Sequence, residues 1–143
     1  MNETWIKRML LLSAAWNITG GVTSLADPAN HFAQMYTLAP AAADDALLMY
    51  FYVCTWINVL AWGVAYGLAA FWPQSRAAVL AAGGAGKAAY FFACVGLVVC
   101  GVGKPLVLAF GLGDLLMAAF FALALVSQRR ERKQRQEGTW LAA

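Results

Sequence analysis

The sequence predicts an all-α integral membrane protein, an antiparallel four-helix bundle with a short interfacial helix after the first span. Two observations predict it. Hydrophobic residues make up 62% of the chain and charged residues only 12%, about half the charged share of an ordinary soluble domain. Four apolar stretches also reach the roughly 20 residues that a helix needs to cross a bilayer. We expect a single transmembrane domain over residues 1–143.

The four expected spans cover about residues 9–26, 47–72, 77–102 and 105–126. Lys7 and Arg8, followed by an apolar run, also fit the start of a signal peptide, but no clear cleavage site follows them. We therefore expect an uncleaved first helix. The later spans are joined by short links, which make the helices they connect antiparallel neighbours.

The longer first loop predicts a helix of its own. Asp27 followed by Pro28 is typical of an N-cap with proline at the first helical position. This pattern predicts a short helix over residues 28–36 that lies in the membrane interface. The side chains expected to turn inward are Phe32, Met35 and Tyr36.

Basic residues predict the orientation of the bundle. Lys7, Arg8, Arg76 and the basic tail at residues 127–143 would all lie on one side of the membrane, whereas Lys104 lies on the other. Because basic residues favour the cytoplasmic side, we expect both termini in the cytoplasm. The tail is expected to lie beside anionic lipid headgroups, and nothing indicates a nucleic-acid partner.

Two charged residues inside the expected spans are the most informative feature. Lys87 lies about 15 Å and Asp114 about 18 Å from the cytoplasmic side, at the helical rise of 1.5 Å per residue. A buried ion pair between them would lower the cost of holding either charge there. Two interpretations stay open: a functional pair that relays protons or anchors a ligand headgroup, and a structural pair that fixes the helix register.

Further polar and aromatic side chains are expected at a similar depth. They are Asn17 on the first span, Asn58, Trp62 and Tyr66 on the second, and Tyr90 on the third. Such residues either join helices through hydrogen bonds or line a small amphiphilic pocket, and the sequence favours neither interpretation.

The remaining reactive residues give little indication of catalysis. Cys54, Cys94 and Cys100 lie in apolar runs without a CxxC pair, and His31, the one histidine, is expected to be exposed on the first loop. We predict no metal site and no cofactor. No nucleophile with a neighbouring base and no phosphate loop is found, so a protein that is not an enzyme is favoured.

The layout resembles the small four-helix bacterial inner-membrane proteins described as DoxX-like or BphX-like. The resemblance rests on Trp16-Asn17, the segment from Asp27-Pro28 to Phe32, Gly86-Lys87 and Gly113-Asp114, and it covers nearly the whole chain. It implies the same bundle in a bacterial inner membrane but no established activity. The DoxX type often carries an arginine in the first span, where this chain has Asn17.

Three functions are compatible with these observations. The first is a non-enzymatic membrane protein that binds a lipid or a small hydrophobic or amphiphilic molecule within the bundle. The second is an accessory or assembly subunit of a larger membrane complex, and the third is a proton-coupled transporter that works as a homo-oligomer. A membrane enzyme of the four-helix isomerase kind would need more acids or histidines within the membrane.

Overall fold

The computed structural model describes residues 2–37 and 44–140. It contains α1 (Glu3–Ala26), α2 (Pro28–Met35), α3 (Ala46–Phe71), α4 (Arg76–Val99) and α5 (Pro105–Trp140). Four of these helices are long and apolar enough to cross a membrane: α1, α3, α4 and α5 as far as Arg130. The predicted all-α bundle of four spans is therefore confirmed, and the chain is a multi-pass membrane protein.

The ends of the helices differ from the predicted spans because hydropathy marks where lipid ends and not where a helix ends. α1 begins at Glu3, before the apolar run, and the side chain of Asn2 caps it by accepting a hydrogen bond from the Thr4 amide. α5 runs through the basic tail as far as Trp140. The predicted short helix is also present, and the side chain of Asp27 caps it at the Asn30 amide.

α4 stops at Val99, earlier than the expected residue 102. The cause is the turn after it, where Gly101 has a φ of 72°, a conformation that glycine adopts without strain. The Val102 amide donates a hydrogen bond to the Leu97 carbonyl at 2.9 Å, and the Gly101 amide donates one to the Val98 carbonyl at 3.0 Å. These two bonds form a Schellman motif, which ends the helix and reverses the chain into α5.

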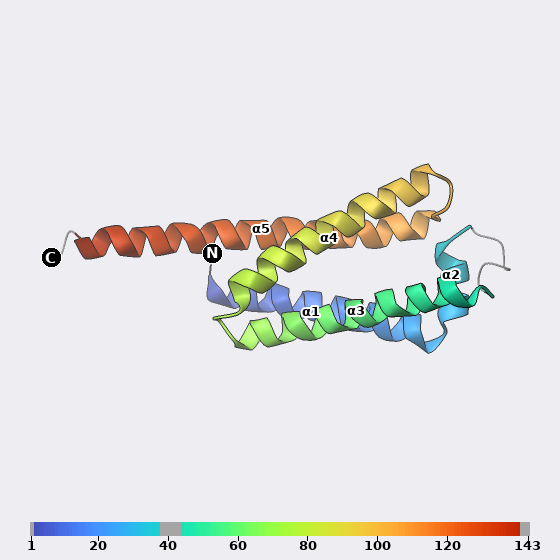
Figure 1. Cartoon of the computed structure of the whole chain (residues 1–143). Coiled ribbons are helices and arrows are strands. Elements are labelled where there is room, and N and C mark those ends of the chain that lie inside the picture. The colour runs from blue at the N-terminus through green and yellow to red at the C-terminus, as the bar shows by residue number, and fades with distance from the viewer. Residues whose placement is uncertain (1, 38–43, 141–143) are drawn as a thin grey trace.

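The four long helices form two pairs (Figure 1). α1 packs along α3 and α4 packs along α5. Glycines permit the close approach in each pair: a Cβ at Gly63 would lie 2.8 Å from Cγ1 of Ile18, and a Cβ at Gly111 would lie 3.0 Å from Cβ of Cys94. Small residues at such contacts allow van der Waals packing between helices in lipid, where the hydrophobic effect does not hold helices together.

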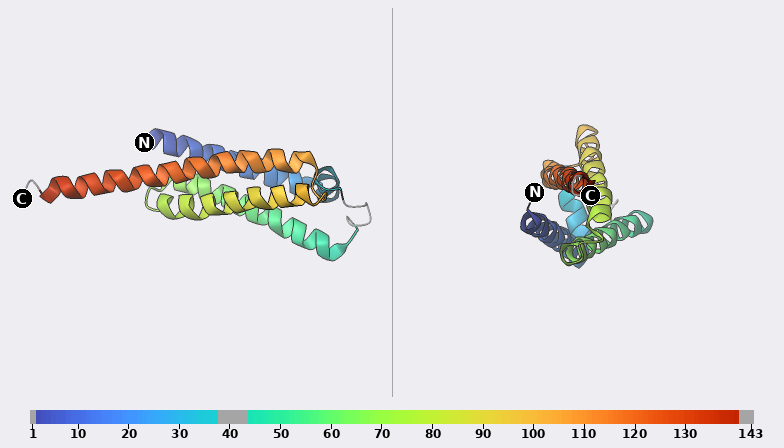
Figure 2. Two further views of the ribbon diagram at one scale, coloured as in Figure 1. Left: turned by 90° about the horizontal axis from the view of Figure 1, so that it is seen from above. Right: turned by 90° about the vertical axis from the view of Figure 1, so that its left-hand side faces the viewer.

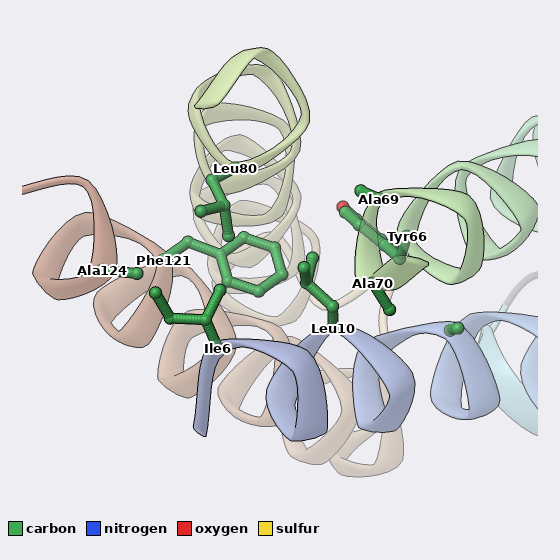
Figure 3. Packing of buried hydrophobic residues seen from close by; sticks show 9 residues of the cluster. Ile6, Leu10, Tyr66, Ala69, Ala70, Leu80, Phe121 and Ala124 are labelled. Carbon is green, nitrogen blue, oxygen red and sulfur yellow. The ribbon is translucent and has the colours of Figure 1, made fainter. Parts of the chain in front are cut away.

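One apolar cluster joins the two pairs, and a second joins α2 to the α4–α5 pair. Near the N-terminus of α1, Ile6 and Leu10 pack with Tyr66, Leu80 and Phe121, so that all four long helices contribute (Figure 3). We call this side the basic end, because Lys7, Arg8, Arg76 and Arg129 lie there. A smaller cluster of Met35, Cys94 and Val107 lies at the opposite end, which we call the α2 end.

α2 joins the two pairs at its own end of the bundle. The Lys104 amide donates to the Met35 carbonyl at 2.9 Å, and the Thr37 amide donates to the Val102 carbonyl at 2.8 Å. Tyr36 and Gly103 form an isolated β-bridge. The segment that follows α1 is therefore bonded to the turn between α4 and α5.

Candidate functional site in the membrane centre

Lys87 lies between the two apolar clusters and bridges both helix pairs. Its Nζ is 2.5 Å from Oδ1 of Asp114 on α5 and 2.9 Å from Oδ1 of Asn17 on α1. The Lys87 side chain is 4% exposed and that of Asp114 is 14% exposed. A charge buried at this depth requires a partner and further hydrogen bonds, and the lysine has both.

Asn17 extends this network to the fourth long helix. Its Nδ2 donates to the backbone carbonyl of Val59 on α3 at 3.3 Å, while its Oδ1 accepts from Lys87. Both ends of the amide are therefore used. One chain of polar contacts runs from α3 through α1 and α4 to α5.

Tyr66 contributes its ring to the same site. The ring centroid lies 5.6 Å from Lys87 Nζ, within the distance at which a cation is attracted to an aromatic face. The ring fits because Gly83 has no side chain: a Cβ there would lie 2.5 Å from Oη of Tyr66. Of the polar-layer candidates, the structure thus brings Asn17 and Tyr66 to the Lys87–Asp114 pair.

The other three candidates do not join this network. Asn58 is exposed and donates from Nδ2 to the carbonyl of Cys54 in its own helix at 2.9 Å. Trp62 is 37% exposed and Tyr90 is 36% exposed. The reason is that α3 and α4 separate toward the α2 end (Figures 1 and 2), so residues on the face of α3 that carries Tyr66 lose contact with α4 farther along. The expectation that Asn58 meets the central pair is wrong.

Arg76 has a structural role that its place among the basic residues of a short loop did not predict. The residue is 6% exposed. Its Nε and Nη2 donate to the carbonyls of Ala69 and Ala70, each at 2.9 Å, and its Nη1 lies 3.1 Å from Oε1 of Glu3. The signal in the sequence was its position just after α3, since cations favour the C-terminal ends of helices.

His31 is not the exposed loop residue that we expected. It is half-buried, its Nδ1 forms a hydrogen bond with Tyr52 Oη, and its Nε2 lies 3.1 Å from Ser24 Oγ. The Trp56 ring meets it edge-on at 5.0 Å. Burial lowers the pKa of His31 below its usual value, which favours the neutral ring. The contact with Ser24 could have been expected from the sequence, because Ser24 and His31 lie on either side of the Asp27-Pro28 turn, which brings them close together.

The described residues offer no other reactive centre. Among the side chains that the structure describes, in residues 2–37 and 44–130, no group of three or more His, Cys, Asp or Glu could hold a metal ion. Cys94 is buried, Cys54 is half-buried and Cys100 is exposed, and all three are free thiols. The arrangement can hold a charge and donate or accept hydrogen bonds in the membrane centre.

The fold and the site define a class of protein: a four-span α-helical membrane protein with a charged pair at its centre. Comparisons with models of known families, with curated proteins and with solved structures found no match. The function is therefore argued from the geometry of this chain.

Proposed function

We propose that the chain is a non-enzymatic membrane protein that binds a lipid or a small hydrophobic or amphiphilic molecule where α3 and α4 separate. The observation that carries this proposal is that Asn58 and Tyr90 keep exposed surface at nearly the depth of the buried Lys87–Asp114 pair. Each also has a partner in its own helix: Asn58 Nδ2 donates to the Cys54 carbonyl, and the Tyr90 hydroxyl hydrogen-bonds with Cys94. The exposed surface of these two polar side chains, between helices that separate, favours a ligand at this position.

The depths of the residues agree with this location. Along their own helices, Asn58 lies about 20 Å from the basic end of α3, and Tyr90 about 21 Å from that of α4. Lys87 lies about one turn closer to the basic end than Tyr90 on the same helix. A ligand between the helices would meet two hydrogen-bonding side chains, with the exposed ring of Trp62 toward the basic end.

The central pair has a supporting role in this proposal. Lys87 is enclosed by Asn17, Asp114 and the Tyr66 ring, whereas the Asp114 side chain keeps some exposure. We infer that the pair holds the two helix pairs together and that the ligand binds beside it. This favours the structural interpretation of the pair over a proton relay.

The resemblance to DoxX-like proteins and the bacterial inner membrane that it implies belong to the same proposal, together with an orientation that places both termini in the cytoplasm. The distribution of charge supports the orientation. Lys7, Arg8, Arg76 and Arg129 lie at the basic end, and Lys104 lies at the α2 end. This asymmetry is the one that the positive-inside rule describes.

The proposal is tested by native mass spectrometry of the full chain purified in mild detergent, with organic extraction to identify bound molecules. We expect a stoichiometric small amphiphile on the wild type and its loss from the variant that combines Asn58→Leu with Tyr90→Phe. Phe92→Leu is the control, because Phe92 is 67% exposed on the same helix. A wild type that carries no small molecule but a stoichiometric protein would overturn the proposal in favour of an accessory subunit.

A further inference from the structure

A groove lies between α4 and α5, and it is separate from the central polar site. Its volume is about 320 Å³, and only these two helices line it, with residues between Leu80 and Ala88 and between Leu115 and Leu125. Every lining residue is alanine, leucine or glycine. The groove is therefore a surface for an apolar chain and offers no hydrogen bond of its own.

The length and depth of the groove match one leaflet of a bilayer. From Leu115 to Leu125 the α5 backbone rises about 15 Å, which is half of the roughly 30 Å hydrocarbon core. The end at Leu125 points toward the basic end, and the end at Leu115 lies beside Asp114, near the centre of the membrane. A straight acyl chain that enters from the basic side has this length and direction.

A positive charge stands at the headgroup end of the groove. Arg129 is exposed and lies seven residues after Ala122 and eleven after Ala118, spacings that place it on the same face of α5. Arg76, at the same end, is occupied by Glu3 and by the carbonyls of α3. Arg129, unlike Arg76, is exposed and lies in line with the groove, and its guanidinium suits phosphate in particular.

We propose that the groove and Arg129 form a binding site for one anionic phospholipid in the leaflet at the basic end. One acyl chain lies along Gly84 and Ala88 of α4 and along Ala118 and Ala122 of α5. The phosphate is held by Arg129. The apolar groove accepts any lipid chain, so the arginine supplies the preference for an anionic headgroup.

Arg130 provides a matched control for this proposal. It is also exposed and one residue away in the same helix, so its removal changes the charge of the tail by the same amount. It is turned by about 100° from Arg129 around the helix and therefore lies off the line of the groove. A site made by the groove distinguishes the two arginines, whereas diffuse attraction to a basic tail does not.

The experiment titrates the delipidated full chain in detergent with phosphatidylglycerol or phosphatidylcholine of identical acyl chains and counts bound lipids by native mass spectrometry. We expect the first phosphatidylglycerol to bind about fivefold more tightly, the factor that corresponds to about 1 kcal/mol for one arginine near the headgroups. Arg129→Gln should abolish that preference and Arg130→Gln should retain most of it. Ala122→Leu, which fills the groove, should weaken binding of both lipids.

Three results would overturn the proposal. Equal affinity for the two lipids removes the headgroup site, and equal losses from the two arginine variants show a diffuse effect of the tail. A lipid-free dimer that Ala122→Leu dissociates would show that a second copy of the chain occupies the groove. The variants at Asn58 and Tyr90 should leave phosphatidylglycerol binding unchanged, so this site and the ligand site between α3 and α4 fail or succeed separately.

Discussion

Asn17 Oδ1 accepts a hydrogen bond from Lys87 Nζ at 2.9 Å, although 70 residues separate them in the sequence. This contact joins α1 to α4 and, through the Lys87–Asp114 pair, to α5. The helix pairs α1–α3 and α4–α5 are also connected by the apolar cluster at the basic end and by α2. Between these, Ser13 Oγ of α1 donates to Met117 Sδ of α5 at 3.3 Å, and the Trp16 and Phe110 ring centroids lie 5.8 Å apart. The polar network therefore supplies the charged part of the connection between the pairs in the middle of the membrane.

The first prediction concerns the space that Gly83 leaves for Tyr66. Gly83→Ala should destabilise the bundle by about 1–3 kcal/mol, because the new Cβ would lie 2.5 Å from Tyr66 Oη and displace the ring. Gly86 is the control, since a Cβ there meets nothing within 4 Å. Gly86→Ala should be neutral or stabilise by up to about 1 kcal/mol. Thermal unfolding in detergent measures both, and equal effects would show that Tyr66 does not depend on this glycine.

The second prediction separates the two sides of the Arg76–Glu3 contact. Glu3 has a side chain that is 73% exposed, so Glu3→Gln should change stability by no more than about 1 kcal/mol. Arg76→Met removes the donors to the Ala69 and Ala70 carbonyls and should cost about 1–3 kcal/mol. Chemical unfolding of the two variants tests this difference. A larger loss from Glu3→Gln than from Arg76→Met would mean that the ion pair, and not the helix-capping bonds, is the important contact.

The third prediction is a pH dependence from His31. Its pKa is lowered in the folded protein from the usual value of 6.5, so the unfolded chain binds more protons over the range between the two values. The stabilising contribution of neutral His31 is therefore complete above pH 6.5 and is lost as the pH falls from there through the folded pKa.

Melting temperatures in detergent between about pH 5 and pH 8 should show this decline in the wild type. His31→Gln should remove the part of the decline that belongs to this range. An unchanged pH profile in the variant would show that another group is responsible.

The fourth prediction is the orientation of the spans. Reporter fusions after the C-terminus should be active only as cytoplasmic reporters, and fusions within α2 (Pro28–Met35) only as periplasmic ones. A periplasmic signal from the C-terminus would contradict the proposed orientation.

The sequence predicted the elements of the fold well, and it did so for physical reasons. Lipid requires long apolar helices, so α3 and α4 were found to within a few residues of their observed ends. The proline after Asp27 similarly marked α2. The end of α5 could not be predicted from hydropathy, because the helix continues beyond its apolar part.

The site was less predictable, because its composition depends on how the helices are tilted. Depth along each helix was enough to suggest that Lys87 and Asp114 could meet. Depth does not reveal where two helices separate, and that separation excludes Asn58 from the network. The contacts of Arg76 and His31 likewise require the distances between elements, which a hydropathy pattern does not contain.

The central claim is that Lys87 and Asp114 act as partners whose main role is to hold the bundle together. Removing one partner leaves a buried charge uncompensated and should cost roughly 3–5 kcal/mol. A survivor that loses its charge would show a smaller loss. Replacing both, with Lys87→Met and Asp114→Asn, should recover much of the stability, since no isolated charge remains.

The most direct test is a double-mutant cycle of thermal stability in detergent, with Lys87→Met, Asp114→Asn and the combined variant compared with the wild type. We predict a combined loss well below the sum of the two single losses, together with retention of the bound small amphiphile by the combined variant. Two single losses that simply add would contradict the partnership. A stable combined variant that no longer retains the amphiphile would contradict the structural role and assign the pair to ligand binding.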